Sequence, residues 1–418
     1  MKKVIAILAL VALTGNIASA ELLKNFKYDG KIEINGFSTN NLSDTHSDLK
    51  DKTSDVNARV QINAGFDLNE DVNAVISAVR CQDQYGDSAN GESAVNTAMD
   101  SFDFEQSYLN LKGVLGFDHK IGRQYYGNEG DLIVYYGPRS VHTVYATANN
   151  LSVTGLEGYT GWYKTGKLDM HAVMAKFNNG VGNQPDLDTD LVGVSAKYDL
   201  MDEVKIGAYI YEAKDYKAGT SDFTKDVVGV KAMGKFMGFD YYAELAKNYG
   251  YKGADVNYTG SAILANVKYD LDLMGKWSFM GEMARGSGDK ASATKDERFT
   301  SVNTDYRPGI IWGAQLNNTG LGNATTWNLG ANWTPAKVEK LTLTGKLYNF
   351  AVTEDTGLTY DRYGNELDLC ANWQHSENVG LKAYYAMFMP EKDYTDAIGA
   401  FKSDDNITTL GAALTVKF

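Results

Sequence analysis

The chain has 418 residues, of which 44% are hydrophobic and 12% aromatic, with 42 Gly, 27 Tyr and only 5 Pro. This composition excludes an intrinsically disordered chain and favours a β-rich fold. The formal net charge of -13 argues against a nucleic-acid-binding protein. The two cysteines, Cys81 and Cys370, are far apart and indicate neither a disulfide framework nor a metal site, and no sequence feature calls for a cofactor.

Residues 1–20 have the pattern of a secretory signal peptide. A basic start at Lys2 and Lys3 precedes an apolar stretch, and the small residues Ala18 and Ala20 occupy the cleavage positions. The alternative is a membrane anchor, but the apolar stretch is shorter than the roughly 20 residues that a spanning helix needs. The sequence therefore predicts export, followed by one mature domain over residues 21–418.

The rest of the chain contains segments of about ten residues, which is the length of a tilted strand across a thin outer membrane. No later segment has the length and apolar character of a spanning helix, so any part inside the membrane is expected to consist of strands. We expect eighteen strands, at residues 27–40, 55–68, 72–83, 101–115, 117–124, 153–165, 167–177, 189–200, 203–213, 226–237, 239–249, 259–270, 275–286, 324–334, 340–351, 365–375, 378–390 and 406–417.

The gaps between these segments alternate in length. Short gaps such as 69–71, Gly116, Gly166 and 201–202 are followed by long polar gaps. This alternation is typical of an up-and-down barrel with short periplasmic turns and long extracellular loops, and a soluble β-sandwich does not require it. The fold class is therefore predicted to be all-β, a transmembrane antiparallel barrel in the outer membrane of a diderm bacterium.

Apolar and polar residues alternate along the clearest segments. In the segment 365–375, Leu367 and Leu369 are expected to face lipid, while Glu366 and Asp368 face the lumen. The last segment alternates in the same way and closes at Phe418, where we expect the barrel-assembly machinery to engage it. Apolar outer faces also permit a homotrimer, as in many porins.

A barrel of about eighteen strands is too wide to be filled by its own side chains, so a water-filled lumen is expected. The long gap at 125–152 holds several glycines, two aromatic pairs and Arg139. We expect it to fold inward as a constriction loop. The gap that begins at Gly286 and runs to Asn323 is expected to be an extracellular loop.

Two stretches resemble a known family. The run Lys120-Ile121-Gly122-Arg123-Gln124, followed by Tyr126-Gly127 and by Thr154-Gly155-Leu156-Glu157, and the later run Asn365-Glu366-Leu367-Asp368-Leu369, are similar to motifs of alginate-export-type outer-membrane porins. The resemblance implies an eighteen-stranded outer-membrane barrel, with a lumen suited in some members to an anionic polysaccharide. The sequence departs from the pattern at Val153, Thr154 and Glu157, so the fold and the channel role are carried over, but alginate is not.

Inward charges set the ion preference of a confined pore. The pore-lining candidates are Arg59, Arg80, Arg123, Arg139, Glu157, Lys197, Lys231, Lys235, Glu244, Glu282, Glu366 and Asp368. Further inward bases are expected at Lys205, Lys268, Lys346 and Lys382. The counts of bases and acids are too close to predict the preferred sign.

The arginines admit two interpretations. Arg59, Arg80 and Arg123, with Arg139, could converge on a carboxylate or sulfate, because guanidinium groups bind such anions through two parallel hydrogen bonds. Alternatively, they pair with Asp67, Glu105 and Glu157 to neutralise a polar wall. Only the first interpretation makes them selectivity residues.

The sequence thus predicts a porin for small hydrophilic or anionic solutes such as ions, sugars and sugar acids. The alternatives are a polysaccharide-export barrel, or a surface-exposed binding or structural barrel with a plugged lumen. An enzyme is a further class, but none of the five histidines is accompanied by a recognisable serine or acid motif. We therefore expect no catalytic residues.

Overall fold

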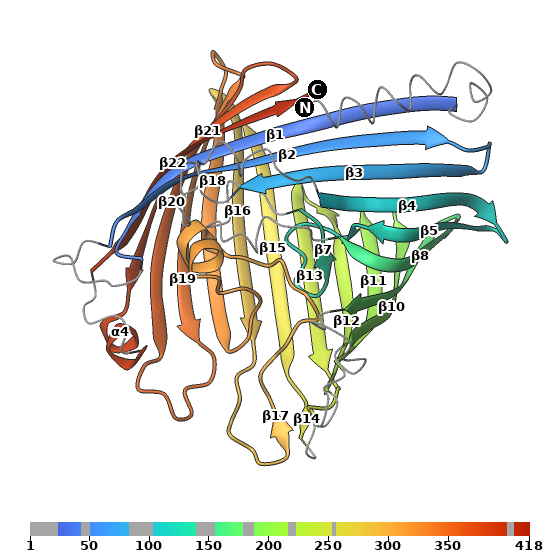
Figure 1. Cartoon of the computed structure of the whole chain (residues 1–418). Helices are drawn as coiled ribbons and strands as arrows, with labels where there is room; N and C mark the ends of the chain where they lie inside the picture. The colour runs from blue at the N-terminus through green and yellow to red at the C-terminus, as the bar shows by residue number, and fades with distance from the viewer. Residues whose placement is uncertain are drawn as a thin grey trace, which may run out of the picture.

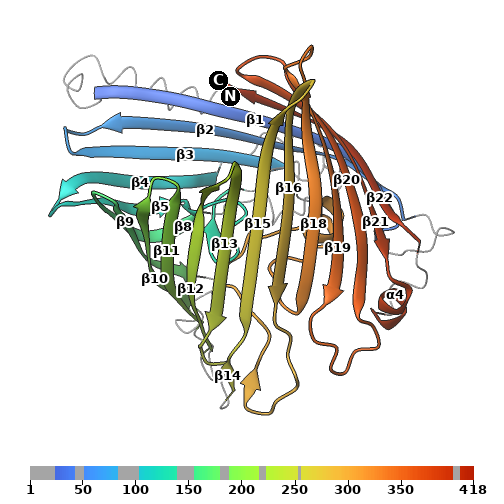
Figure 2. The ribbon, with the colours of Figure 1, turned by 180° about the vertical axis from the view of Figure 1, so that it is seen from behind.

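The computed structural model describes residues 24–42, 51–82, 103–138, 155–178, 188–215, 223–252, 256–398 and 405–418. Eighteen strands form one sheet in which each strand is antiparallel to its neighbours. The sheet closes because β1 pairs both with β2 and with the last strand, β22. Figures 1 and 2 show the resulting barrel from opposite sides.

The barrel strands follow one another around the wall in chain order. They are β1 (Lys24–Asn40), β2 (Thr53–Asp67), β3 (Val72–Gln82), β4 (Asp103–Val114), β5 (Phe117–Gln124), β8 (Leu156–Thr165), β9 (Leu168–Asn178), β10 (Asp188–Met201), β11 (Val204–Asp215), β12 (Phe223–Phe236), β13 (Phe239–Asn248), β15 (Ser261–Asp272), β16 (Gly275–Gly286), β18 (Ala324–Pro335), β19 (Leu341–Val352), β20 (Arg362–Gln374), β21 (Val379–Pro390) and β22 (Ile407–Lys417).

The structure confirms the predicted all-β barrel and overlaps every one of the eighteen predicted segments. Strands β5 and β16 have the predicted bounds. The short connections lie at one end, and two long loops, one carrying β14 (Asn257–Tyr258) and the other carrying β17 (Lys295–Asp296), extend from the other end (Figure 1). We assign the end with short turns to the periplasm and the end with long loops to the extracellular side.

The two faces of the wall differ as the alternation predicts. Leu369, Leu329 and Val194 are exposed on the outer face. Glu366 and Asp368, which alternate with Leu367 and Leu369 along β20, are buried inside. A closed barrel exposes a lipid-facing surface outside, so these exposed apolar side chains are in their expected place.

Other short elements lie between the barrel strands. They are β6 (Tyr126–Gly127), β7 (Tyr135–Tyr136), the π-helix η1 (Gly309–Gln315) and the α-helix α4 (Lys392–Ile398), in addition to β14 and β17. Within the described ranges, no helix has both the length and the apolar character needed to cross a membrane. Buried apolar residues gather inside the barrel, where loop residues such as Leu132 and Ile133 join inward side chains of the wall such as Leu191 and Val227.

Candidate functional site: the lumen and its two inward loops

Residues 125–138, the described part of the predicted constriction loop, pack against the inner face of the wall. We call this segment the first inward loop. Its hairpin pairs β6 with β7, and Leu132, Ile133 and Val134 are buried against inward residues of β8 to β16. The Tyr126 hydroxyl lies 3.0 Å from the Tyr211 hydroxyl on β11. Residues 139–152 of the predicted loop, including Arg139, lie outside the described residues.

A second loop also enters the barrel, between β16 and β18. We call residues 287–323 the second inward loop. Its backbone runs beside the first loop, because Tyr135 N–H donates to the Asn303 carbonyl (2.8 Å) and Asn303 N–H donates to the Ile133 carbonyl (3.0 Å). Phe299 and Leu321 are buried in the same apolar cluster. This segment was predicted to be an extracellular loop; it carries β17 at the extracellular end, but Phe299, Ile311 and Leu321 lie inside the barrel, which the sequence did not predict.

Glu366 anchors the second inward loop to the far wall. The backbone N–H groups of Ile311 and Trp312, at the start of η1, donate to its two carboxylate oxygens at 2.7 and 2.8 Å. Asp368 accepts from Ile310 N–H at 3.2 Å. The first N–H groups of a helix have no acceptor within the helix, and here the two carboxylates accept their hydrogen bonds. The N-terminal end of a helix carries partial positive charge, which also favours these carboxylates. The two predicted lumen acids of β20 therefore hold a loop.

Aromatic packing reinforces this attachment. The Trp312 ring stacks on Phe350 with a centroid separation of 5.1 Å, and it lies 5.5 Å from the Phe388 ring. At the end of η1, the Gln315 amide donates to the hydroxyls of Thr39 and Thr409 at 3.2 and 3.1 Å. The second inward loop is thus fixed to β19–β22 and to β1.

Glu282 and Glu244 also form hydrogen bonds or ion pairs with the second inward loop or with wall residues that contact the first inward loop. The Tyr306 hydroxyl donates to Glu282 at 2.8 Å, which ties the second inward loop to β16. Glu244 accepts hydrogen bonds from the hydroxyls of Tyr209 (2.6 Å) and Tyr242 (2.5 Å). The Lys231 ammonium lies 3.6 Å from Glu244 and 3.9 Å from Asp131 of the first inward loop. Burial raises the pKa of the Asp131 carboxyl above its ordinary value.

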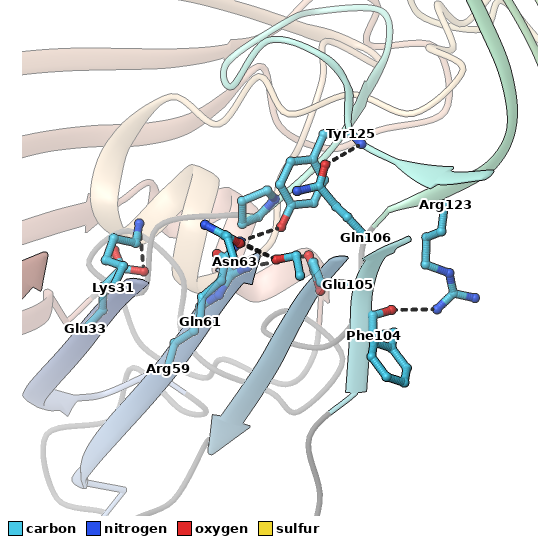
Figure 3. A network of polar contacts seen from close by, with 12 residues as sticks. Lys31, Glu33, Arg59, Gln61, Asn63, Phe104, Glu105, Gln106, Arg123 and Tyr125 are labelled. Carbon is cyan, nitrogen blue, oxygen red and sulfur yellow. Dashed lines mark hydrogen bonds and ion pairs between the residues drawn. The ribbon is translucent and has the colours of Figure 1, made fainter. Parts of the chain in front are cut away.

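Arg59 is a buried structural cation. Its guanidinium lies 3.5 Å from the Glu105 carboxylate, and both side chains are almost fully buried. It also donates to Gln61, whose amide donates to the Tyr125 hydroxyl at 3.2 Å. Figure 3 shows this network at the root of the first inward loop. Burial, followed by the nearby Glu105 charge, raises the pKa of Tyr125. For Arg59, the structure therefore agrees with the second interpretation, in which the arginine pairs with an acid of the wall, here Glu105.

Arg123, Arg80 and Glu157 do not face the lumen, so the expectation for these three residues is wrong. Arg123 pairs with Glu157 across β5 and β8, and both side chains are exposed on the outer face. Figure 3 shows Arg123 directed away from the Arg59 network. Arg80 of β3 lies opposite Val60 of β2 in the strand register. Successive residues of a strand face opposite sides, so Val60 faces outward because Arg59 faces inward, and Arg80 therefore faces outward too.

The remaining candidate lysines face inward as predicted. Lys197 lies 3.6 Å from Asp169, and Lys235 lies 3.6 Å from Asp240. Sequence reasoning missed Lys120, which is three residues from Arg123 and on the opposite face. Its ammonium lies 4.9 Å from the ring centroids of both Tyr108 and Trp162. The signal was the uninterrupted alternation of β5, in which Lys120 alternates with the outward residues His119 and Ile121.

The model of the family described as "Alginate export" matches residues 36–406. The chain belongs to the alginate export family. The predicted family resemblance is confirmed. No curated protein sequence matches the chain.

Solved structures share the fold of this alginate export family member. OccAB2 of Acinetobacter baumannii has a TM-score of 0.63 and 12% identity, with 95% of this chain and 98% of that chain covered. The outer membrane protein OprD of Pseudomonas aeruginosa has a TM-score of 0.57 and 11% identity, with 95% and 94% covered. OccK2 of the same species, solved with glucuronate, has a TM-score of 0.59 and 10% identity, with 95% and 99% covered. The family and the barrel place the chain in the outer membrane, as predicted.

A hollow of about 510 Å³ lies between the first inward loop and the wall of this family member. Its size is that of a small-molecule site. We call it the lumen pocket; its lining includes Tyr125, Asp131, Trp162, His171, Lys197 and Lys231. In the described parts of the chain, no three His, Cys, Asp or Glu side chains are grouped so that they could hold a metal ion.

Proposed function

We propose that this barrel is a porin that passes small hydrophilic solutes and prefers anions. One observation carries the preference for anions: the oxygens of the inward acids Glu244, Glu282, Glu366 and Asp368 are engaged by loop or wall groups, whereas three inward lysines form no salt bridge with any described residue and are partly exposed. These lysines are Lys120, Lys346 and Lys382. Unpaired cations in a confined aqueous lumen favour anions.

The two inward loops supply the constriction in this proposal. The first is attached to β11 and β12 through Tyr211 and Lys231, and the second reaches β20 through Glu366. Backbone hydrogen bonds join the two loops between these walls. Solutes therefore pass beside the loops, and the lumen pocket is the space where we expect a small solute to be held.

The test is the reversal potential of the purified full chain in a planar bilayer under a KCl gradient. Replacing Lys120, Lys346 and Lys382 together by Gln is expected to move it towards cation preference. Lys247→Gln, which removes a lysine exposed on the outer face, is the matched control and should leave it unchanged. An unchanged reversal potential in the triple variant would overturn the proposed preference.

The family's description, alginate export, supports a second function, the passage of an anionic polysaccharide. Threading a polymer past the two joined loops requires them to separate, whereas a sugar acid needs only the space beside them. Single-channel block by glucuronate and by a uronic-acid polymer distinguishes the two functions. Block by the monomer alone supports the small-solute porin, and interruptions whose duration grows with polymer length support export.

We further propose that the chain is not an enzyme. His119 lies on the outer face, where Nδ1 is 2.7 Å from the Tyr159 hydroxyl. His171 faces the lumen, and its Nε2 lies 2.9 Å from the Asp169 carboxylate, so its ring is hydrogen-bonded to a wall residue. Hydrolysis of phospholipids or peptides by the solubilised protein, with loss of that activity in His171→Ala, would contradict this proposal.

Biogenesis and assembly complete the proposal. Residues 1–20 are the cleaved leader, which sequencing the N-terminus of the mature protein tests. The barrel-assembly machinery engages β22 and the residue that follows it, Phe418, which is exposed and exchanges backbone hydrogen bonds with Gly30. Deleting Phe418 should lower the amount assembled in the membrane. The outer wall is apolar enough for a homotrimer, and chemical cross-linking in membranes checks that state.

A further inference from the structure

An apolar groove runs along the outer wall over β12, β13, β15 and β16, which lie side by side in Figure 2. Its hollow of about 600 Å³ is lined by Val228, Val230, Leu245 and Ile263. A second hollow of about 530 Å³ shares Val230 and Leu245 with the first and continues over β10 and β11. The groove therefore extends along the wall from its extracellular part towards the membrane centre.

Two cations stand at the extracellular end of this groove. In the strand register, Lys247 of β13 lies opposite Ser261 of β15, and Arg285 of β16 lies opposite Ile263 of β15. The two bases therefore flank β15 on the outer face. Strand spacing puts their backbones about 10 Å apart across the sheet. Both side chains are exposed, and neither forms an ion pair or a side-chain hydrogen bond with any described residue.

Other outward charges at this level behave differently. Lys176 on β9 lies 3.8 Å from Asp190 on β10. The outward acids Glu212 and Asp226 face each other across β11 and β12 and form no ion pair with Lys247 or Arg285. The pair of free bases is thus confined to the end of the groove.

We propose that this groove and its two bases bind a phosphorylated glycolipid of the outer leaflet. Acyl chains lie along Val228, Val230 and Leu245, where they meet apolar side chains. The phosphate groups meet Lys247 and Arg285, because charge-assisted hydrogen bonds to a guanidinium and an ammonium suit phosphate oxygens. The bases lie at the extracellular end of the wall, which favours a lipid of the outer leaflet over one of the inner leaflet. Two separate bases suit a headgroup that carries two phosphate groups.

Native mass spectrometry of the full chain with diphosphoryl lipid A tests the proposal. The wild type is expected to retain one lipid molecule, and Lys247→Gln combined with Arg285→Gln is expected to weaken binding by about tenfold or more. Lys176→Gln is the matched control and should bind as the wild type does. Unchanged single-channel conductance shows that the variant barrels are intact.

Three further additions identify the ligand. Dephosphorylated lipid A and phosphatidylglycerol are expected to bind at least tenfold more weakly than diphosphoryl lipid A, and millimolar inorganic phosphate should not displace it. Equal binding of either lipid, or displacement by inorganic phosphate, would overturn the proposed ligand. Equal binding of diphosphoryl lipid A by the double variant would overturn the site.

Discussion

The backbone N–H of Ile311 donates a 2.7 Å hydrogen bond to the Glu366 carboxylate, which joins a loop inside the lumen to the wall at β20. These two residues are 55 positions apart in the sequence. Glu366 is fully buried, so this bond is protected from competition with water. The position of the second inward loop thus depends on an inward acid that the strand pattern marks as a pore-lining charge.

Replacing Glu366 by Leu should release η1 from the wall. Two buried N–H groups lose their acceptor, at a cost of about 1–3 kcal/mol each. We expect larger and noisier single-channel conductance, because the second inward loop then samples positions away from β20. The control is Glu377→Gln in an exposed periplasmic turn, which should conduct like the wild type. A quiet, unchanged conductance in Glu366→Leu would show that the loop is held elsewhere.

Lys120 and Arg123 are a matched pair on one strand, because they lie on opposite faces of β5. Lys120→Gln should move the reversal potential towards cation preference, because it removes an inward positive charge. Arg123→Gln should leave it unchanged, because its side chain is on the outer face with Glu157. The same recording under a KCl gradient measures both variants, and the reverse pattern would mean that β5 is inverted relative to the lumen.

Asp131 should give the pore a pH-dependent ion preference. Burial raises the pKa of its carboxyl, so the carboxyl becomes neutral at a higher pH than an exposed aspartate does. Its protonation as the pH falls removes a negative charge beside Lys231, and anion preference should therefore rise. Asp131→Asn should show the higher anion preference at neutral pH and a smaller change on acidification. Identical pH profiles of reversal potential in both proteins would contradict this role.

Gly127 permits the tight hairpin of the first inward loop. Its φ is +79°, and a Cβ atom there would lie 2.3 Å from the Val134 carbonyl oxygen. Gly127→Ala should destabilise the hairpin by about 1–3 kcal/mol, with increased proteolytic cleavage of the loop. Gly130→Ala is the control, since its φ is +85° but no atom lies within 4 Å of a Cβ there. Equal cleavage of the two variants would rule out the steric cause.

The eighteen strands could be predicted because each crosses between lipid and water, which imposes a period of two on the sequence. Lys197, Lys231 and Lys235 were placed correctly because β10 and β12 alternate without interruption near them. On β5 the alternation puts Arg123 on the same outer face as Phe117 and Ile121, and Arg123 was misplaced because its charge was taken as inward. On β8 the pattern does not identify the face of Glu157, because the apolar Leu156 faces inward.

The inward path of residues 287–323 was beyond the sequence for a different reason. Loop residues carry no periodic signal, and the partners that hold this segment come from distant strands. Tyr306 binds Glu282 on β16, and Trp312 binds Glu366 on β20. The acids themselves were identified as inward-facing, but their partners became visible only in three dimensions.

The most direct test of the whole account is planar-bilayer recording of the purified wild-type chain under a KCl gradient, with glucuronate added afterwards. The account predicts discrete conductance steps, a reversal potential on the anion side, and fewer or smaller steps with glucuronate. The absence of steps, or a reversal potential on the cation side, would contradict it.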